Sequence, residues 1–140
     1  MSMPNPKRTA VRVQKVRLYP DVEMKQVLDE LCDYRRYCWN EALALWNDMY
    51  EQSLILDDRK SRPSEYKVRN ELVSEKQDWQ YALSARVLQL SVSDLNKAFR
   101  NFFDKAQTDW GKPKFKSKKA PRQGFKTDRA RIVNGKLLLD

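Results

Sequence analysis

The chemistry that this sequence offers is concentrated in one basic segment, residues 112–131. It holds nine lysine and arginine residues against a single acid, Asp128. If the segment is extended, successive side chains face opposite sides, so Lys114, Lys116 and Lys118 form a cationic edge and Phe115 faces away from it. Such an edge binds phosphate groups and releases their counterions, which gives strong, salt-dependent affinity with little sequence preference.

Two aromatic residues, Phe115 and Phe125, interrupt these cations. Each can anchor the segment onto an adjoining sheet, or it can stack on an exposed nucleic-acid base. We favour the anchoring role for Phe115. A solvated, disordered tail is the third interpretation, but Pro113 and Pro121 punctuate the segment and a hairpin signal follows it.

Charge divides the chain into three parts. Residues 1–20 carry five basic side chains and no acid, residues 21–110 carry 13 basic and 17 acidic side chains, and residues 111–140 carry ten basic and two acidic ones. The formal net charge is +9. Two cationic ends around a nearly balanced middle indicate that the ends converge on one polyanionic ligand, while the middle forms a packed scaffold.

Signals of catalysis, metal binding and membrane insertion are missing from the sequence. It contains no histidine and only three glycines, and no phosphate-binding glycine loop is present. The adjacent acids Asp57 and Asp58 are typical of a solvated loop. Cys32 and Cys38 fit a helical pattern and are expected to be reduced core residues. We therefore expect an intracellular, nucleic-acid-associated chain that is not itself an enzyme and holds no metal.

Periodicity and capping residues predict the elements that position this segment. A valine-rich strand is expected at residues 9–18, and Asp21 caps a long amphipathic helix that ends near residue 52. A second helix is expected to start at Pro63 or Ser64 and to run to about residue 76. A third is expected from near Ser84 to about residue 106, with an apolar stripe at Leu88, Val92, Leu95, Phe99, Phe102 and Ala106. Asn134 and Gly135 predict a type I′ hairpin. A lone hairpin is marginally stable, so we expect it to share one sheet with the first strand, with the helices inserted between them. That sheet looks incomplete, which favours the N-terminal part of a longer protein.

Several stretches together resemble one family. They are "VRLYPD" (16–21), "YRRYCWNEALALW" (34–46), "LSVSDLNKAFRNFF" (90–103), "KPKFKSKK" (112–119), "QGFKTD" (123–128) and "IVNGKLLL" (132–139). In this order and spacing they resemble the N-terminal half of TnpB proteins, the OrfB-type products of small insertion sequences, which are akin to compact type V CRISPR effectors. Members of this family are RNA-guided DNA endonucleases. The resemblance covers nearly the whole chain.

The resemblance implies an α+β fold in which a helical bundle, the recognition domain, is inserted into an incomplete wedge-type β-barrel. Residues 1–20 would form the first part of the barrel, residues 21–110 the bundle, and residues 111–140 the basic segment and hairpin of the barrel. Catalysis in the family belongs to a RuvC-like nuclease domain and a zinc ribbon that follow the region matched here. Magnesium and zinc are therefore expected only in those domains, and no catalytic residue and no cofactor are assigned to this chain.

The resemblance also implies which residues bind nucleic acid. The segment around Lys114, Phe115 and Lys116 would contact guide RNA and DNA beside the target. Arg86 and Gln89 would read the short target-adjacent motif, because these side chain types bond base edges bidentately; the alternative is that both are solvent-facing helix residues. The full candidate set is Arg12, Lys15, Arg17, Arg86, Gln89, Lys112, Lys114, Phe115, Lys116, Lys118, Lys119, Arg122, Phe125 and Lys126.

The expected partners are guide RNA and target DNA, with a second copy of the chain as a way to complete the sheet, in the cytoplasm of a prokaryote. The sequence leaves two other functions open. One is a stand-alone DNA-binding module of a transposase or a nuclease-dead, transposon-derived repressor. The other is an interaction module whose basic ends serve only solubility.

Overall fold

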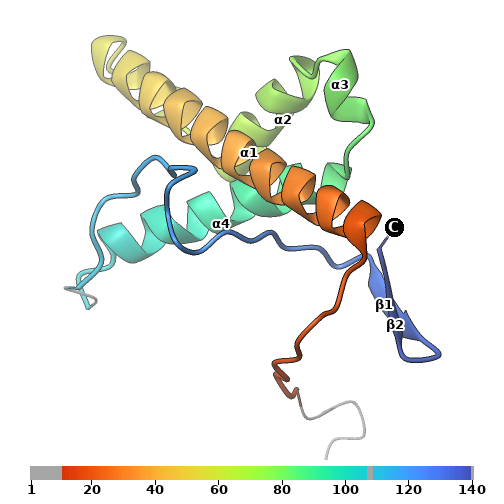
Figure 1. Ribbon diagram of the computed structural model, residues 1–140. Coiled ribbons are helices and arrows are strands. Elements are labelled where there is room, and N and C mark those ends of the chain that lie inside the picture. Colours follow the sequence, from red (N-terminus) through yellow and green to blue (C-terminus); the bar gives the residue numbers. More distant parts are fainter. Residues whose placement is uncertain (1–10, 107–108, 140) are drawn as a thin grey trace, which may run out of the picture.

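One long helix, α1 (Val22–Ile55), is the framework of the protein (Figure 1). The structure is a computed structural model that describes residues 11–106 and 109–139. Asp21 caps α1 and accepts a hydrogen bond of 2.8 Å from the backbone N–H of Met24. With 34 residues and a rise of about 1.5 Å each, α1 is about 50 Å long. The predicted helix from Asp21 is confirmed.

Four further helical elements follow α1. They are the 3-10 helix η1 (Arg59–Ser61), α2 (Glu65–Ser74), the single turn α3 (Asp78–Tyr81) and α4 (Ala85–Phe103). The Ser64 hydroxyl caps α2 by accepting a hydrogen bond from the N–H of Lys67. The helices predicted from Ser64 and Ser84 are confirmed at their starts, although α4 ends three residues before the expected residue 106.

The hydrophobic core lies where α4 and α2 pack against one face of α1. Its buried residues are Leu31, Tyr34, Cys38, Trp39, Ala42, Leu43, Trp46, Val68, Val87, Leu88, Val92, Leu95 and Phe99. Trp46 of α1 stacks on Phe99 of α4, with ring centroids 4.7 Å apart. The predicted apolar stripe of α4 is buried at Leu88, Val92, Leu95 and Phe99, because this spacing places apolar side chains on one helical face. Its last two members, Phe102 and Ala106, are exposed.

A two-stranded antiparallel sheet follows the basic segment. It pairs β1 (Ala130–Val133) with β2 (Lys136–Leu139). The turn residues Asn134 and Gly135 have φ angles of 50° and 74°. Both angles are positive, as a type I′ turn requires, so the predicted hairpin is confirmed. The described residues therefore form an α+β structure, with helices and one small sheet.

The strand expected at residues 9–18 is not formed in its described part. Residues 11–20 have no regular secondary structure, and Val11 and Val13 are 90% and 96% exposed. The prediction was wrong because a strand needs a hydrogen-bonded neighbour, and none of the described residues pairs with this stretch. Residues 9 and 10 lie outside the described part. Among the described residues, the sheet has two strands and no barrel wall is built.

The core generates a stability prediction. Leu95 lies at the centre of the α1–α4 contact and is 0% exposed. Leu95→Ala should lower the free energy of unfolding by about 2–5 kcal/mol, because it removes buried methyl groups and leaves a cavity. Leu54→Ala is the matched control, since Leu54 is 56% exposed in α1 and should change stability by less than about 0.5 kcal/mol. Chemical denaturation measures both; equal losses would contradict this core.

Candidate nucleic-acid interface

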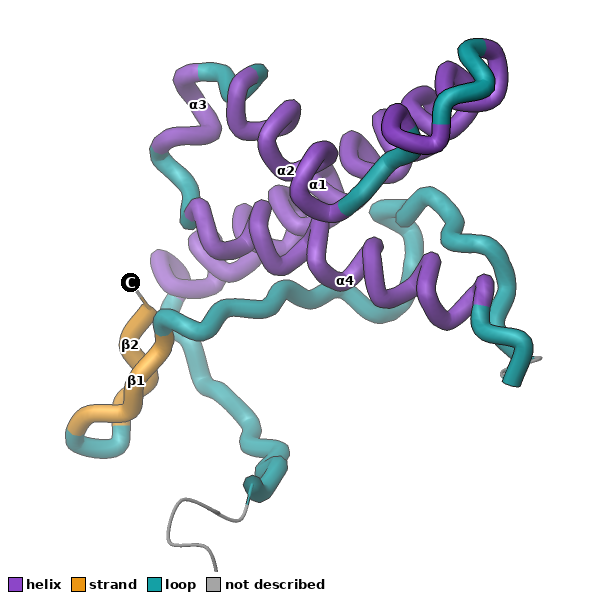
Figure 2. The backbone as a smooth tube through the Cα atoms, turned by 180° about the vertical axis from the view of Figure 1, so that it is seen from behind, coloured by secondary structure: helices purple, strands orange, loops and turns teal. Residues whose placement is uncertain are grey.

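The basic segment runs as an extended chain beside α1 and α4 until it enters β1 (Figures 1 and 2). Its described residues before β1 form neither helix nor strand. Their backbone groups must therefore find partners outside a regular hydrogen-bond ladder. Several of these partners are side chains of the helices.

Two neighbouring residues of α1 hold the backbone of the segment. The indole N–H of Trp39 donates to the carbonyl oxygen of Lys114 at 2.8 Å. The Asn40 amide makes a two-way contact with Lys116: its nitrogen donates to the Lys116 carbonyl at 3.0 Å, and its oxygen accepts from the Lys116 N–H at 2.7 Å. We call these three bonds the Trp39–Asn40 clamp. They fix both position and orientation of the chain at residues 114–116.

The clamp turns Lys116 toward the helices. Its ammonium group lies 4.3 Å from the centroid of the Trp39 ring, a cation–π contact. Burial, and secondly the positive charge of Arg35, lower the pKa of Lys116. Lys116 was expected on one cationic edge with Lys114 and Lys118, but it is partly buried whereas those two lysines are exposed.

Phe115 consequently points away from the helices, with 60% of its surface exposed. We expected it to anchor the segment, and this is a second correction: the clamp anchors the backbone instead. Stacking on a base is the interpretation that an exposed ring leaves open. Phe125 does serve as an anchor, since it is half-buried and packs against the core, but its support is the helical core rather than a sheet.

Gln123 organises the turn that follows the clamp. Its amide nitrogen donates to the carbonyl oxygens of Ser117 and Ala120 at 3.1 and 3.0 Å. Its amide oxygen accepts a hydrogen bond of 3.2 Å from the guanidinium of Arg36 in α1. One side chain thus closes the turn and ties it to the helix.

The candidate base-reading residues, Arg86 and Gln89, are engaged within the protein. The Arg86 guanidinium forms a two-pronged ion pair with Asp128, one bond of which measures 2.8 Å, and also donates to the Gln89 side chain. These bonds raise the pKa of Arg86 and lower that of Asp128. This ion pair is therefore weakened as pH falls through the depressed pKa of Asp128. The sequence analysis treated both residues as free. Asp128, the single acid of the basic segment, was the signal that Arg86 has a partner.

A second ion-pair cluster surrounds Asp94 of α4. The Lys126 ammonium lies 2.9 Å from one carboxylate oxygen, and the Arg35 guanidinium lies 3.5 Å from the other. The Asp94 side chain is only 13% exposed, whereas that of Lys126 is 62% exposed. Lys126 thus holds the segment against α4 and offers a partly neutralised charge.

The remaining candidate cations are exposed. Lys112, Lys114, Lys118, Lys119 and Arg122 form no ion pair with the described residues. Arg12, Lys15 and Arg17 are also exposed, on the unpaired N-terminal stretch, where the Arg17 guanidinium lies 5.7 Å from the centroid of the Tyr19 ring. Sequence reasoning missed four contributors from α1, namely Arg35, Arg36, Trp39 and Asn40, because helix periodicity does not distinguish a helix face that binds another segment.

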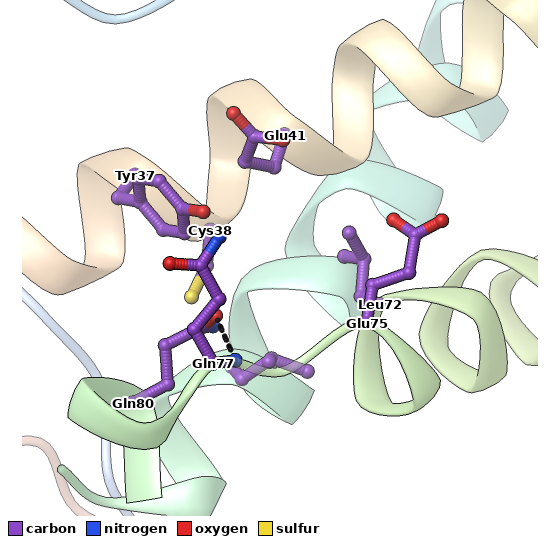
Figure 3. A pocket seen from close by; sticks show the side chains of 8 residues that line it. Tyr37, Cys38, Glu41, Leu72, Glu75, Gln77 and Gln80 are labelled. Atoms are coloured by element: carbon purple, nitrogen blue, oxygen red, sulfur yellow. Dashed lines mark hydrogen bonds between the residues drawn. The ribbon is translucent and has the colours of Figure 1, made fainter. Parts of the chain in front are cut away.

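The opposite side of α1 is acidic and aromatic. A cavity of about 300 Å³ between α1, α2 and α3 is lined by Tyr37, Glu41 and Glu75 among others (Figure 3). The pKa of Glu75 is raised, first by its contact with Glu71. Cys38 also lines the cavity, and burial raises its pKa to about 12, so its thiol stays protonated. Carboxylates repel phosphate, so the basic segment, and not this side of α1, is the candidate nucleic-acid interface.

Residues 11–54 match the family model HTH_OrfB_IS605, which is described as a helix-turn-helix domain. The chain therefore carries an OrfB-type N-terminal region, as the resemblance implied. No curated protein matches the chain. No helix in the described part of the chain has the length and apolar composition needed to cross a membrane. Within residues 11–106 and 109–139, no group of three metal-binding side chains is present.

The OrfB-type region does not form two helices in this structure. Its residues 11–20 are irregular, and residues 22–54 belong to the single uninterrupted helix α1. Helix-turn-helix proteins read the DNA major groove with a second helix. The residues matched by the family model supply no such second helix. The basic segment that α1 holds is therefore the stronger candidate for contact with nucleic acid.

The clamp yields a test by amide hydrogen exchange. Asn40→Ala leaves the Lys116 N–H and carbonyl without their partners, each loss being worth about 1–3 kcal/mol if the groups stay buried. We expect the Lys116 amide to exchange about ten-fold faster or more, while core amides of α4 keep their protection. Asn47→Ala is the control on the same helix, since Asn47 makes no side-chain hydrogen bond with the described residues. Unchanged exchange at Lys116 would refute the clamp.

Proposed function

We propose that this chain is the nucleic-acid-binding N-terminal lobe of a transposon-encoded, RNA-guided DNA endonuclease, and that it binds guide RNA and target-adjacent DNA. The observation that carries the proposal is the basic segment, which α1 holds in a defined path. A flexible cationic tail loses conformational entropy when it binds. A basic segment that is already ordered loses less, so its affinity is higher for the same contacts. The OrfB-type region supports the transposon context.

The exposed side chains of the segment suit a single strand of nucleic acid. Lys112, Lys114 and Lys118 can neutralise successive phosphates, and each contact releases counterions. Phe115 lies between Lys114 and Lys118 in the sequence. Its ring is exposed, so a base can stack on it. Guide RNA, whose unpaired bases can splay out onto aromatic rings, matches this combination better than an uninterrupted duplex.

We further propose that residues 1–20 and 111–140 belong to one wedge-type β-barrel around the helical domain of residues 21–110. The hairpin leaves apolar side chains uncovered, with Ile132 76% and Val133 42% exposed. The groove between residues 17–21, α1 and β2 encloses about 460 Å³ and is largely apolar. Further strands, from a longer chain or from a second copy, would cover these surfaces.

In this proposal the chain binds and positions nucleic acid, and cleavage belongs to a separate nuclease domain with its metal-binding acids. Arg86 and Gln89 would then act by holding the basic segment against α4 rather than by reading bases. Reading the target-adjacent motif would fall to exposed residues of the segment or of the N-terminal stretch.

A stand-alone DNA-binding module of a transposase or repressor is the second candidate. The family match favours it, because its description names a helix-turn-helix domain. The uninterrupted α1 disfavours it, because that helix presents no turn and no second helix within the matched residues.

Competition binding decides between the two functions. Structured RNA from the 3′ end of the transposable element should displace a labelled RNA probe far better than random duplex DNA does. Lys112, Lys114 and Lys118 changed together to alanine should lower the slope of log affinity against log salt by about 2–3, since each phosphate contact contributes somewhat under one counterion.

The control variant changes Lys25, Arg59 and Arg62 to alanine, which removes the same charge from exposed sites on the helical scaffold. Its salt slope should stay close to that of the wild type. Equal affinity for structured RNA and random duplex DNA would favour the stand-alone module instead. Equal slopes for the two triple variants would place the interface elsewhere.

Substitution of Phe115 tests stacking. Phe115→Leu keeps an apolar side chain of similar volume but removes the aromatic face, so affinity for single-stranded RNA should fall by about 1–3 kcal/mol. The free energy of unfolding should change by less than about 0.5 kcal/mol, because the ring is exposed. Phe125→Leu should show the reverse pattern, with a loss of stability, since Phe125 packs against the core. Lost stability without lost affinity at Phe115 would restore the anchoring interpretation.

A further inference from the structure

A small, strongly basic cavity lies between α1 and the turn that Gln123 organises. Its volume is about 40 Å³, and roughly 10–15 Å³ suffices for one water, so the space admits a small polyatomic group. Its lining includes Arg35, Arg36, Lys116, Ser117, Arg122 and Gln123. Four of these are cations, and none is an acid.

The acids that surround this cavity do not balance its cations. Asp33 pairs with Arg36 at 3.0 Å. Asp94 pairs with Arg35 at 3.5 Å but also with Lys126 at 2.9 Å, so its single charge is shared. Lys116 and Arg122 have no carboxylate partner among the described residues. Asp29 forms no ion pair with the described residues, but its charge also acts on Cys32 of the cavity lining. Five cations thus share three carboxylates around the cavity.

Contacts among the described residues hold this excess of positive charge together. The Trp39–Asn40 clamp fixes the backbone of Lys116, and Gln123 joins Arg36 to the turn. Positive charges that cannot separate repel one another at a cost to folding. The mutual repulsion of Arg35 and Lys116 is one cause of the lowered pKa of Lys116. An anion in the cavity would relieve this repulsion.

We propose that this cavity binds one phosphate group of a nucleic-acid strand that lies along the basic segment. The guanidinium groups of Arg35, Arg36 and Arg122 supply planar sets of N–H donors suited to phosphate oxygens, and Lys116 adds a compact charge. Arg122 is exposed at the cavity, so the strand enters from the solvent side. This inference rests on the proposed function, because it names the point at which the bound strand is held.

The test compares two double variants that lose equal charge. The double variant Arg35→Gln/Arg122→Gln removes two positive charges from the cavity. The control Lys118→Gln/Lys119→Gln removes two exposed positive charges that do not line it. Affinity for a short single-stranded RNA should fall about ten-fold or more in the cavity variant and about two- to three-fold in the control. Arg122→Gln alone, at an exposed site, repeats the measurement if the cavity variant does not fold.

A second arm uses inorganic phosphate and does not depend on RNA. At constant ionic strength, phosphate should raise the thermal midpoint of the wild type and of the Lys118/Lys119 control, relative to chloride, by more than it raises that of the cavity variant, which reports the general stabilisation by an excluded anion. Equal rises in all three proteins would overturn the site. Equal RNA losses in both double variants would overturn the inference while the proposed function stands. A wild type that binds phosphate but no nucleic acid would overturn both the strand-binding site and the proposed function. Absence of any phosphate effect in the wild type would overturn the site itself.

Discussion

The structure depends on how an extended chain without a strand partner satisfies its backbone hydrogen bonds. Residues 112–129 form no ladder with a neighbouring strand, yet they run beside the helices although most of their side chains are exposed. Trp39 and Asn40 meet this requirement at residues 114–116, because the indole N–H and the carboxamide together supply two donors and one acceptor, as a neighbouring β-strand would. This attachment to α1 fixes the path of the basic segment at residues 114–116.

The cations of the attached segment fall into two classes, those in ion pairs with the helices and those that are exposed. Arg86 pairs with Asp128 and Lys126 pairs with Asp94, and these two ion pairs hold the segment to the bundle. Exposed ion pairs contribute little to stability on their own, so their effect here is to fix a path rather than to stabilise a fold. The exposed lysines remain free to meet phosphate. A segment with strong self-repulsion is thereby ordered without losing its positive surface.

The two sides of α1 differ in charge. The side that carries the basic segment gathers arginine and lysine around a small cavity, whereas the cavity between α1, α2 and α3 is bounded by glutamates (Figure 3). A polyanion is attracted to the first side and repelled by the second, so it approaches in one orientation. The net charge of the whole chain does not predict this orientation. The orientation arises because the folded chain places the basic segment on one side of α1 and the glutamates on the other.

The sequence by itself determined α1, α2, α4, the hairpin and the charge partition. Asp21 and Ser64 as caps, the apolar stripe of α4 and the Asn134–Gly135 turn act within a few residues, so local pattern was sufficient to predict them. Only the tertiary structure decided that Lys116 turns inward and Phe115 outward, because the bond from Trp39 to Lys114 joins residues 75 positions apart. It also decided that residues 11–18 form no strand, since strand formation depends on a neighbour and not on valine content. Contacts between side chains and distant backbone follow no period, and so the sequence pattern carries no sign of them.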